Sequence, residues 1–385
     1  MDAPGRLSTL RKLLASAFFL DAGFFLLVAA VPYKVLSLGG GALELGVTPT
    51  VSSVFYITLT HLAGRGSDRW GRYRMARYGA LAMILFGALA YAAPHWARLL
   101  LVMPLLGLGA ALYWPAIQAG VGDLSRGPRE LERHTGRFNL AWSLGKSLGF
   151  LAAGLLLARY DFHATFLTAI GLIALSIFGL PRREVEDAEE PAEEPSAAEI
   201  TDARRQAFRR MAWMANALAF GAGAILTNFL PQIFEQRGWP ESRFGLLLGL
   251  LYTLQTLVFL LLSGKVRFTY SLRRLLAPQI LAAGALLAMP LLPGYWPLLA
   301  LMPLLGLSFG VCYSASIYYS LDTDSGRGRN AGVHESLIGT GILLFPLLGG
   351  LLARLSGDTL LTLYMAGGVM LAGVIVQWIW WRRSA

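Results

Sequence analysis

The chain of 385 residues has a single cysteine, Cys312, and few charged side chains, which make up 15% of the total. One cysteine excludes an internal disulfide framework and a metal cluster built from cysteine ligands. So little charge, combined with 55% hydrophobic residues and a mean hydropathy of +0.54, does not suit one soluble core. The composition therefore predicts a helical protein that crosses a membrane several times.

Sequence motifs of enzymes are also missing. Gly145-Lys-Ser147 resembles the end of a phosphate-binding loop, but Leu140 stands where that loop needs its first glycine. The pair His334-Glu335 lacks the second histidine of the H-E-x-x-H zinc motif. We therefore predict that the chain is not an enzyme and that it has no cofactor and no metal site.

Long hydrophobic runs are abundant instead. The first run follows Arg6, Arg11 and Lys12; it is long enough to span a membrane and lacks a signal-peptide cleavage pattern, so we expect it to be the first span. Twelve spans are expected, at approximately residues 13 to 32, 46 to 63, 75 to 93, 99 to 121, 138 to 158, 162 to 180, 211 to 230, 244 to 262, 273 to 292, 296 to 320, 331 to 353 and 359 to 380.

Membrane topology explains the net charge of +10 better than nucleic-acid binding does, because the basic residues lie in short loops between apolar runs. With both termini in the cytoplasm, 26 of the 33 Lys and Arg residues fall on the cytoplasmic side and six on the outer side. This asymmetry predicts twelve spans with both ends inside. We expect a monomer in the cytoplasmic membrane of a bacterium, in contact with lipid and not with nucleic acid.

Two halves of the chain are related. The hexapeptide from Met103 to Leu108 recurs from Met302 to Leu307, 199 positions later. The repeat predicts a bundle of six helices over residues 1–180, a linker over 181–210 and a second bundle over 211–385. The linker is acidic, and we expect a solvated tether, with a regulatory docking segment as the alternative. A second basic loop, Gly264–Arg267, is a degenerate copy of a loop described below.

Polar residues are distributed unevenly among the spans. Every third span, the third, sixth, ninth and twelfth, has no charged residue in its core. Polar side chains are costly in lipid, so the other eight spans are expected to surround a central aqueous cavity. The residues expected to line it are Tyr56, Trp114, Gln118, Asn139, Trp142, Asn216, Tyr252, Gln255, Tyr313, Tyr318 and His334. The tyrosines and tryptophans among them suit an amphipathic or aromatic solute.

Three charged residues are candidates for coupling or substrate binding. Asp21 and Lys146 each lie about 12 Å along spans that enter from the cytoplasm, given ~1.5 Å per residue. We hypothesise that they face each other or share a water-filled pocket, where Asp21 titrates and Lys146 is released or binds an anion. The alternative is a permanent structural pair. Glu335 either couples or gates, or is simply an acid at a helix N-terminus.

The segment between the second and third spans carries a recognisable pattern. It reads Gly64-x-x-x-Asp68-Arg69-x-Gly71-Arg72-x-Arg74, and its glycines are expected to allow a tight turn. The pattern resembles the loop signature of the major facilitator superfamily, with Gly66 where that family usually has leucine. The resemblance implies that Asp68, Arg69 and Arg72 form a cytoplasmic gate near the start of the eleventh span.

This resemblance implies a secondary transporter that works by rocking two bundles around a central site. The general layout is most similar to the export and drug-efflux branches, and we predict transport of a small organic, amphipathic, aromatic or anionic solute, coupled to protons through Asp21. Two features depart from those branches: Met103 precedes Gly107 where an arginine is common, and Phe150 follows Gly149 where proline is common. The alternatives are a lipid translocator of the same fold, a uniporter with a structural Asp21–Lys146 pair, and a receptor.

Overall fold

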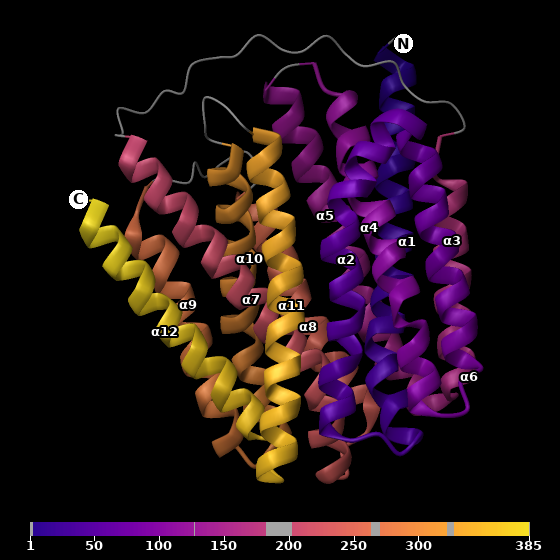
Figure 1. Ribbon diagram of the computed structural model, residues 1–385, viewed down its shortest axis with the longest axis vertical. Coiled ribbons are helices and arrows are strands. Elements are labelled where there is room, and N and C mark those ends of the chain that lie inside the picture. Colours follow the sequence, from indigo (N-terminus) through magenta and orange to yellow (C-terminus); the bar gives the residue numbers. More distant parts are fainter. Residues whose placement is uncertain (1–2, 127, 182–201, 263–269, 322–326, 385) are drawn as a thin grey trace.

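A computed structural model describes residues 3–126, 128–181, 202–262, 270–321 and 327–384 (Figure 1). Within these ranges the backbone forms only helices, as predicted. They are α1 (Ala3–Ser37), α2 (Ala42–Trp70), α3 (Arg72–Tyr91), α4 (Trp96–Asp123), α5 (Pro128–Arg159), α6 (Phe162–Phe178), α7 (Asp202–Gln236), α8 (Glu241–Leu262), α9 (Leu272–Ala288), the 3-10 helix η1 (Met289–Leu291), α10 (Tyr295–Leu321), α11 (Arg327–Ser356) and α12 (Leu361–Ser384). Most of the predicted linker, and the second basic loop at Gly264–Arg267, lie outside the described residues.

Ten of the described helices contain a stretch that is long and apolar enough to cross a membrane. The other two α-helices coincide with the third and sixth expected spans. Helix α6 is apolar but has 17 residues, and α3 has 20 residues with three arginines in its first six. At about 1.5 Å per residue, both are near the minimum for a hydrocarbon core of roughly 30 Å.

The repeated hexapeptides make the same contact in the two halves of the chain. In α4, a Cβ atom on Gly107 would lie 2.1 Å from the carbonyl oxygen of Ser52 in α2. In α10, a Cβ atom on Gly306 would lie 2.5 Å from the carbonyl oxygen of Leu251 in α8. Each residue of the second contact stands 199 positions after its counterpart in the first. The repeat therefore preserves a helix crossing that only glycine permits.

Helices of the two halves also pack closely at glycines. Helix α5 packs on α8, where a Cβ atom on Gly154 would lie 2.6 Å from the Cα atom of Gly245. Helix α2 packs on α11, where a Cβ atom on Gly350 would lie 3.0 Å from the Cα atom of Gly46. Figure 1 shows α2 and α11 side by side between the indigo and orange halves. Two glycine crossings thus bring the halves together backbone to backbone.

The four helices of the spans that were expected to lack charge in their cores stand at the edges of the molecule. Figure 1 shows α3 and α6 at one edge and α9 and α12 at the other. Their outward side chains, such as Leu85 of α3 and Ile375 of α12, are exposed, as expected for helices that face lipid. One buried polar pair joins α9 to α12, because the amides of Gln279 and Gln377 donate to each other at 3.0 and 2.8 Å. The remaining eight helices enclose the middle of the protein.

Candidate functional site

A cavity of about 210 Å³ lies in the middle of the protein, between the two halves. Its lining comes from α1, α2, α4, α5, α7, α8, α10 and α11, and from none of the four edge helices. This is the set of eight helices that polarity predicted. Most of the wall is apolar, and the predicted site residues that line it are Tyr56, Trp114, Lys146, Tyr252 and Gln255.

Lys146 of α5 is the only charged side chain in the described lining of this cavity. Its side chain is buried, and its Nζ atom lies 3.7 Å from the ring centroid of Tyr252, 4.6 Å from that of Phe25 and 5.5 Å from that of Phe220. Ring faces attract a cation but accept no conventional hydrogen bond. The ammonium group is therefore held by three rings from α1, α7 and α8.

Asp21 lies beside Lys146 but outside the cavity wall. A Cβ atom on Gly145 would lie 3.1 Å from the Cβ atom of Asp21, so α1 and α5 are in close contact at this level. The carboxylate is 0% exposed and neither oxygen has a hydrogen-bond partner. In the part of the chain that is described, no ion pair joins Asp21 to Lys146. Removing either charge would leave the other buried and less compensated.

Glu335 of α11 connects the two halves at the margin of the cavity. Its Oε2 atom accepts a hydrogen bond from the hydroxyl of Tyr56 in α2 at 2.7 Å. Its Oε1 atom accepts one from the amide of Gln118 in α4 at 3.0 Å. Charge-assisted hydrogen bonds of this kind are stronger than neutral ones. These three residues, here called the Glu335 network, are thus brought together from segments more than 200 residues apart.

Six other predicted cavity residues are absent from the described lining, and five of them are in contact with one another. The Nδ1 atom of His334 lies 2.7 Å from the hydroxyl of Ser316 and 3.4 Å from the amide of Asn216. The ring of Tyr313 packs on those of His334 and Trp142, and Asn139 accepts a hydrogen bond from Trp142 Nε1. Tyr318 is half-buried and packs on Tyr319. Protein neighbours satisfy part of this polarity, while the Oδ1 atom of Asn216 and the Nε2 atom of His334 are buried without a hydrogen-bond partner.

Of the three rings around the lysine, the sequence predicted Tyr252 as a cavity residue but not Phe25 or Phe220. Phe25 stands four residues after Asp21, so helical spacing placed it on the same face of α1. Phe220 comes from the other half of the chain, and only the packing of α7 brings it to Lys146. Asn228 also lines the cavity, while donating to the carbonyl oxygen of Ala224 at 2.8 Å. The signal for Asn228 in the sequence is a polar side chain within an otherwise apolar span, which predicts a position that faces the interior.

The motif between the second and third spans is mostly helical, contrary to the expected loop. Helix α2 continues to Trp70, and Gly64 lies inside it, so Gly64 does not serve a tight turn. The chain turns at Gly71 alone, where φ is +96° and an L side chain would be strained. A helix does not need apolar side chains to continue, and α2 extends past the apolar run into exposed residues such as Arg69.

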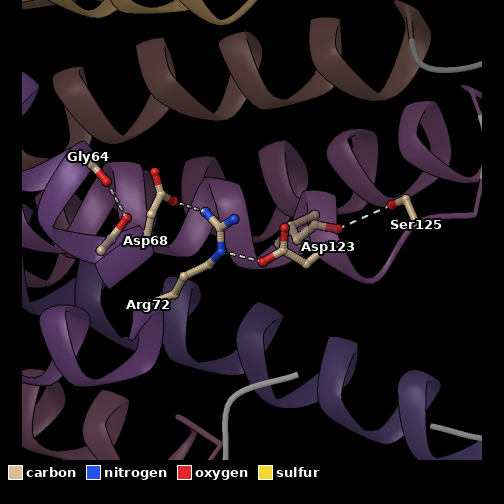
Figure 2. Close-up of polar contacts among 7 residues, drawn as sticks. Gly64, Asp68, Arg72, Asp123 and Ser125 are labelled. Carbon is tan, nitrogen blue, oxygen red and sulfur yellow. Dashed lines mark hydrogen bonds and ion pairs between the residues drawn. The ribbon is translucent and has the colours of Figure 1, made fainter. Parts of the chain in front are cut away.

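Figure 2 shows the guanidinium of Arg72 between two carboxylates. Arg72 forms an ion pair with Asp68 at 3.4 Å, one turn earlier, and a second ion pair with Asp123 at the end of α4. Asp68 is exposed, whereas Arg72 and Asp123 are partly buried. The described pairs therefore join α2, α3 and α4 within the first half. Contacts of this motif with α11 stay a prediction.

A family model described as Major Facilitator Superfamily matches residues 13–333. The chain is 24% identical over 387 residues to "Multidrug resistance protein 2" of Bacillus subtilis, covering 97% of this chain and 95% of that protein. It is 31% identical over 219 residues to a "Probable 4-methylmuconolactone transporter" of Cupriavidus pinatubonensis, covering 54% of this chain and 50% of that protein.

Solved structures share the fold. A bacterial homolog of the human lysosomal transporter Spinster, inward-facing and occupied, has a TM-score of 0.70 at 13% identity, with 100% of this chain and 97% of that chain covered. A mutant of the nucleoside transporter NupG has a TM-score of 0.69 at 13% identity, with 97% and 99% covered. At this level of identity the likenesses show a shared fold, over 97–100% of this chain.

Proposed function

Because the chain belongs to the major facilitator superfamily, and is thus a membrane transporter and not an enzyme, we propose that it is a secondary active transporter of small organic solutes. The proposal includes twelve spans, both termini in the cytoplasm, and two bundles over residues 1–180 and 211–385 joined by the linker. It also includes a monomer in a bacterial cytoplasmic membrane. The two halves rock around the central cavity, which opens to each side in turn.

The cavity itself is the observation on which this proposal rests. Eight helices, four from each half, contribute to its wall, and helices of the two halves cross at glycines. A site between two repeats that touch through small residues is suited to alternating access, since a small rotation of one repeat exposes it to either side. The Glu335 network is one polar bridge that such a rotation breaks.

Asp21 is the proposed proton-coupling group. It is a carboxyl group without a hydrogen-bond partner, buried next to a lysine that reaches the cavity. Protonation of Asp21 removes the neighbouring negative charge from Lys146 and so changes how strongly the lysine binds an anion. This provides a direct route by which a proton and a solute influence each other. Export is the proposed direction, following the relative from Bacillus subtilis.

Flux into proteoliposomes tests this function. The purified protein is reconstituted, a pH gradient is imposed, and accumulation is measured for ethidium, uridine and 4-hydroxybenzoate. We expect accumulation of at least one solute above that in empty liposomes. Asp21→Asn is expected to keep downhill exchange and to lose accumulation, whereas Asp161→Asn, which changes an exposed acid at the start of α6, is the matched control.

Three results would count against parts of the proposal. Full accumulation by Asp21→Asn would eliminate the proton role of that residue. Equilibration of a solute by the unmodified protein, without accumulation under any gradient, would indicate a uniporter in which Asp21 and Lys146 are structural. Absence of flux for all three solutes would contradict the proposed transport of small organic solutes.

A further inference from the structure

We propose that the cavity binds a compact organic anion, with an acidic group at Lys146, an apolar body against the wall, and a hydrogen-bond donor facing Gln255. This deepens the proposed function, because it names the substrate class of the same cavity. The juxtaposition that carries it is a buried lysine without an acceptor and a buried amide oxygen without a donor in the wall of the same cavity.

The ammonium group of Lys146 has unused hydrogen-bonding capacity. A lysine carries three N–H donors, and in the described part of the chain Nζ has ring faces around it but no oxygen acceptor. Lys146 lines the cavity, so a solute reaches it from there. A carboxylate of the solute would supply the missing acceptor and a charge of opposite sign.

The described wall contains no carboxylate that would pair with a cation. Asp21 is fully buried and outside the lining, and Glu335 is outside it as well, with both oxygens engaged by Tyr56 and Gln118. A cationic solute would therefore meet the charge of Lys146 in a largely apolar space without a neutralising group. This charge pattern selects against organic cations and favours anions.

The second recognition element is Gln255 of α8. Its side chain lines the cavity and is 2% exposed, and its Oε1 atom has no hydrogen-bond partner. Buried amide oxygens are rarely left unpaired. A hydroxyl or N–H group on the solute would satisfy it, so the favoured solute has a donor separated from its acidic group by an apolar unit.

The size of the cavity limits that apolar unit. About 210 Å³ is available, whereas pockets for drug-sized ligands begin at roughly 300 Å³. The wall of the cavity also includes Phe25, Phe309 and Ile338. A single ring fits this space and these surfaces. Hydroxylated aromatic or alicyclic monocarboxylates are therefore the predicted class.

Binding to the purified, full-length protein tests the inference. Isothermal titration calorimetry at pH 7 compares 4-hydroxybenzoate with benzoate, with the neutral 4-hydroxybenzamide and with the cationic 4-hydroxybenzylamine. We expect 4-hydroxybenzoate to bind at least about tenfold more tightly than the amide or the amine, as for one buried charge-assisted contact. Benzoate is expected to bind several-fold more weakly, because it leaves the Gln255 oxygen unpaired.

Variants test whether Lys146 causes the preference for the acid and whether Gln255 causes the preference for the hydroxyl group. Lys146→Gln is expected to bind the acid and the amide equally, whereas Lys146→Arg keeps the charge and the preference for the acid. Gln255→Leu is expected to bind benzoate and 4-hydroxybenzoate equally. Lys34→Gln is the matched control, since Lys34 also lies over a phenylalanine ring, at 5.3 Å from Phe162, but outside the cavity. Size-exclusion chromatography verifies that each variant is folded.

The inference is overturned if the unmodified protein binds the amide or the amine as tightly as the acid, or binds none of the four probes. It is also overturned if folded Lys146→Gln keeps the preference for the acid. Gradient-driven accumulation of ethidium or uridine alone, independent of Lys146, would leave the proposed transporter function intact while refuting the anionic substrate class. The two proposals therefore fail in different assays.

Discussion

Glu335→Gln is predicted to shift the protein toward the state in which the two halves separate at the Glu335 network. Glutamine keeps the shape of the side chain and removes its charge. A hydrogen bond to a charged group contributes about 1.5–3 kcal/mol and a neutral one about 0.5–1.5 kcal/mol, so each of the two bonds to Tyr56 and Gln118 loses roughly 1 kcal/mol. A total of about 2 kcal/mol corresponds to roughly a 30-fold change in the equilibrium constant.

Labelling of a cavity cysteine measures this shift. The only native cysteine, Cys312, is fully buried and is replaced by alanine. Ala110 of the cavity wall is then changed to cysteine and its reaction with a water-soluble maleimide is timed. When opening is fast relative to labelling, the rate follows the population of the open state, so Glu335→Gln is expected to accelerate it by about 30-fold.

A control and a double-mutant cycle make the result decisive. Ser336→Ala changes the next residue of α11, whose hydroxyl bonds only within its own helix, to Gly332 at 2.9 Å; no acceleration is expected. Tyr56→Phe should accelerate labelling in the unmodified background and much less in Glu335→Gln, since the two residues share one interaction. An unchanged rate in Glu335→Gln, or fully additive effects in the double variant, would refute the reasoning.

Two further predictions concern packing. Gly154→Leu is expected to abolish flux in a folded protein, because its Cβ atom would lie 2.6 Å from the Cα atom of Gly245, whereas Gly171→Leu, with nothing within 4 Å, should keep normal flux in the same liposome assay. Gln279→Leu is expected to lower stability by about 1–3 kcal/mol because it leaves the buried amide of Gln377 unpaired; thermal unfolding should show the loss, and adding Gln377→Leu should restore it. Normal flux in Gly154→Leu, or no recovery in the double leucine variant, would contradict these accounts.

Polarity within the spans predicted which helices meet in the centre. Charge in lipid is costly, so the spans with Asp21 and Lys146 had to face inward, and spans without charge were free to face outward. The repeated hexapeptide predicted two related halves, but not the crossings at Gly107 and Gly306, which only the packing reveals. The inward placement of the charged spans follows from single residues and from the membrane, and it needs no knowledge of the tertiary packing.

The partners of each charged group were not predictable in the same way. Glu335 finds Tyr56 and Gln118 across more than 200 residues, and the crossing of α2 with α11 decides that contact. The extent of α2 was also underestimated, because hydropathy marks the end of the lipid-facing run rather than the end of the helix. Residues from Gly64 to Trp70 therefore looked like a loop while continuing the helix.

The two halves also correspond where α1 meets α5 and α7 meets α11. A Cβ atom on Gly145 would lie 2.3 Å from the carbonyl oxygen of Phe18, and one on Gly341 would lie 2.2 Å from that of Ala217. Phe18 and Ala217 are again 199 positions apart, while Gly145 and Gly341 are 196 apart. The same pair of helices thus crosses in the same way in each half, which fixes a residue-to-residue correspondence around the cavity.

Under that correspondence, Asp21 and Lys146 have no charged counterparts in the second half. Asp21 corresponds to Phe220 and Lys146 corresponds to Ile342, and the two apolar counterparts both line the cavity. Phe220 is moreover one of the rings around the Lys146 ammonium. The helix crossings are therefore related by the repeat, as a rocking motion requires, while the charged side chains are not. The first half supplies Asp21 and Lys146, and the second half places the apolar side chains of Phe220 and Ile342 at the corresponding positions, where they strengthen the electrostatic interactions of the pair by excluding water.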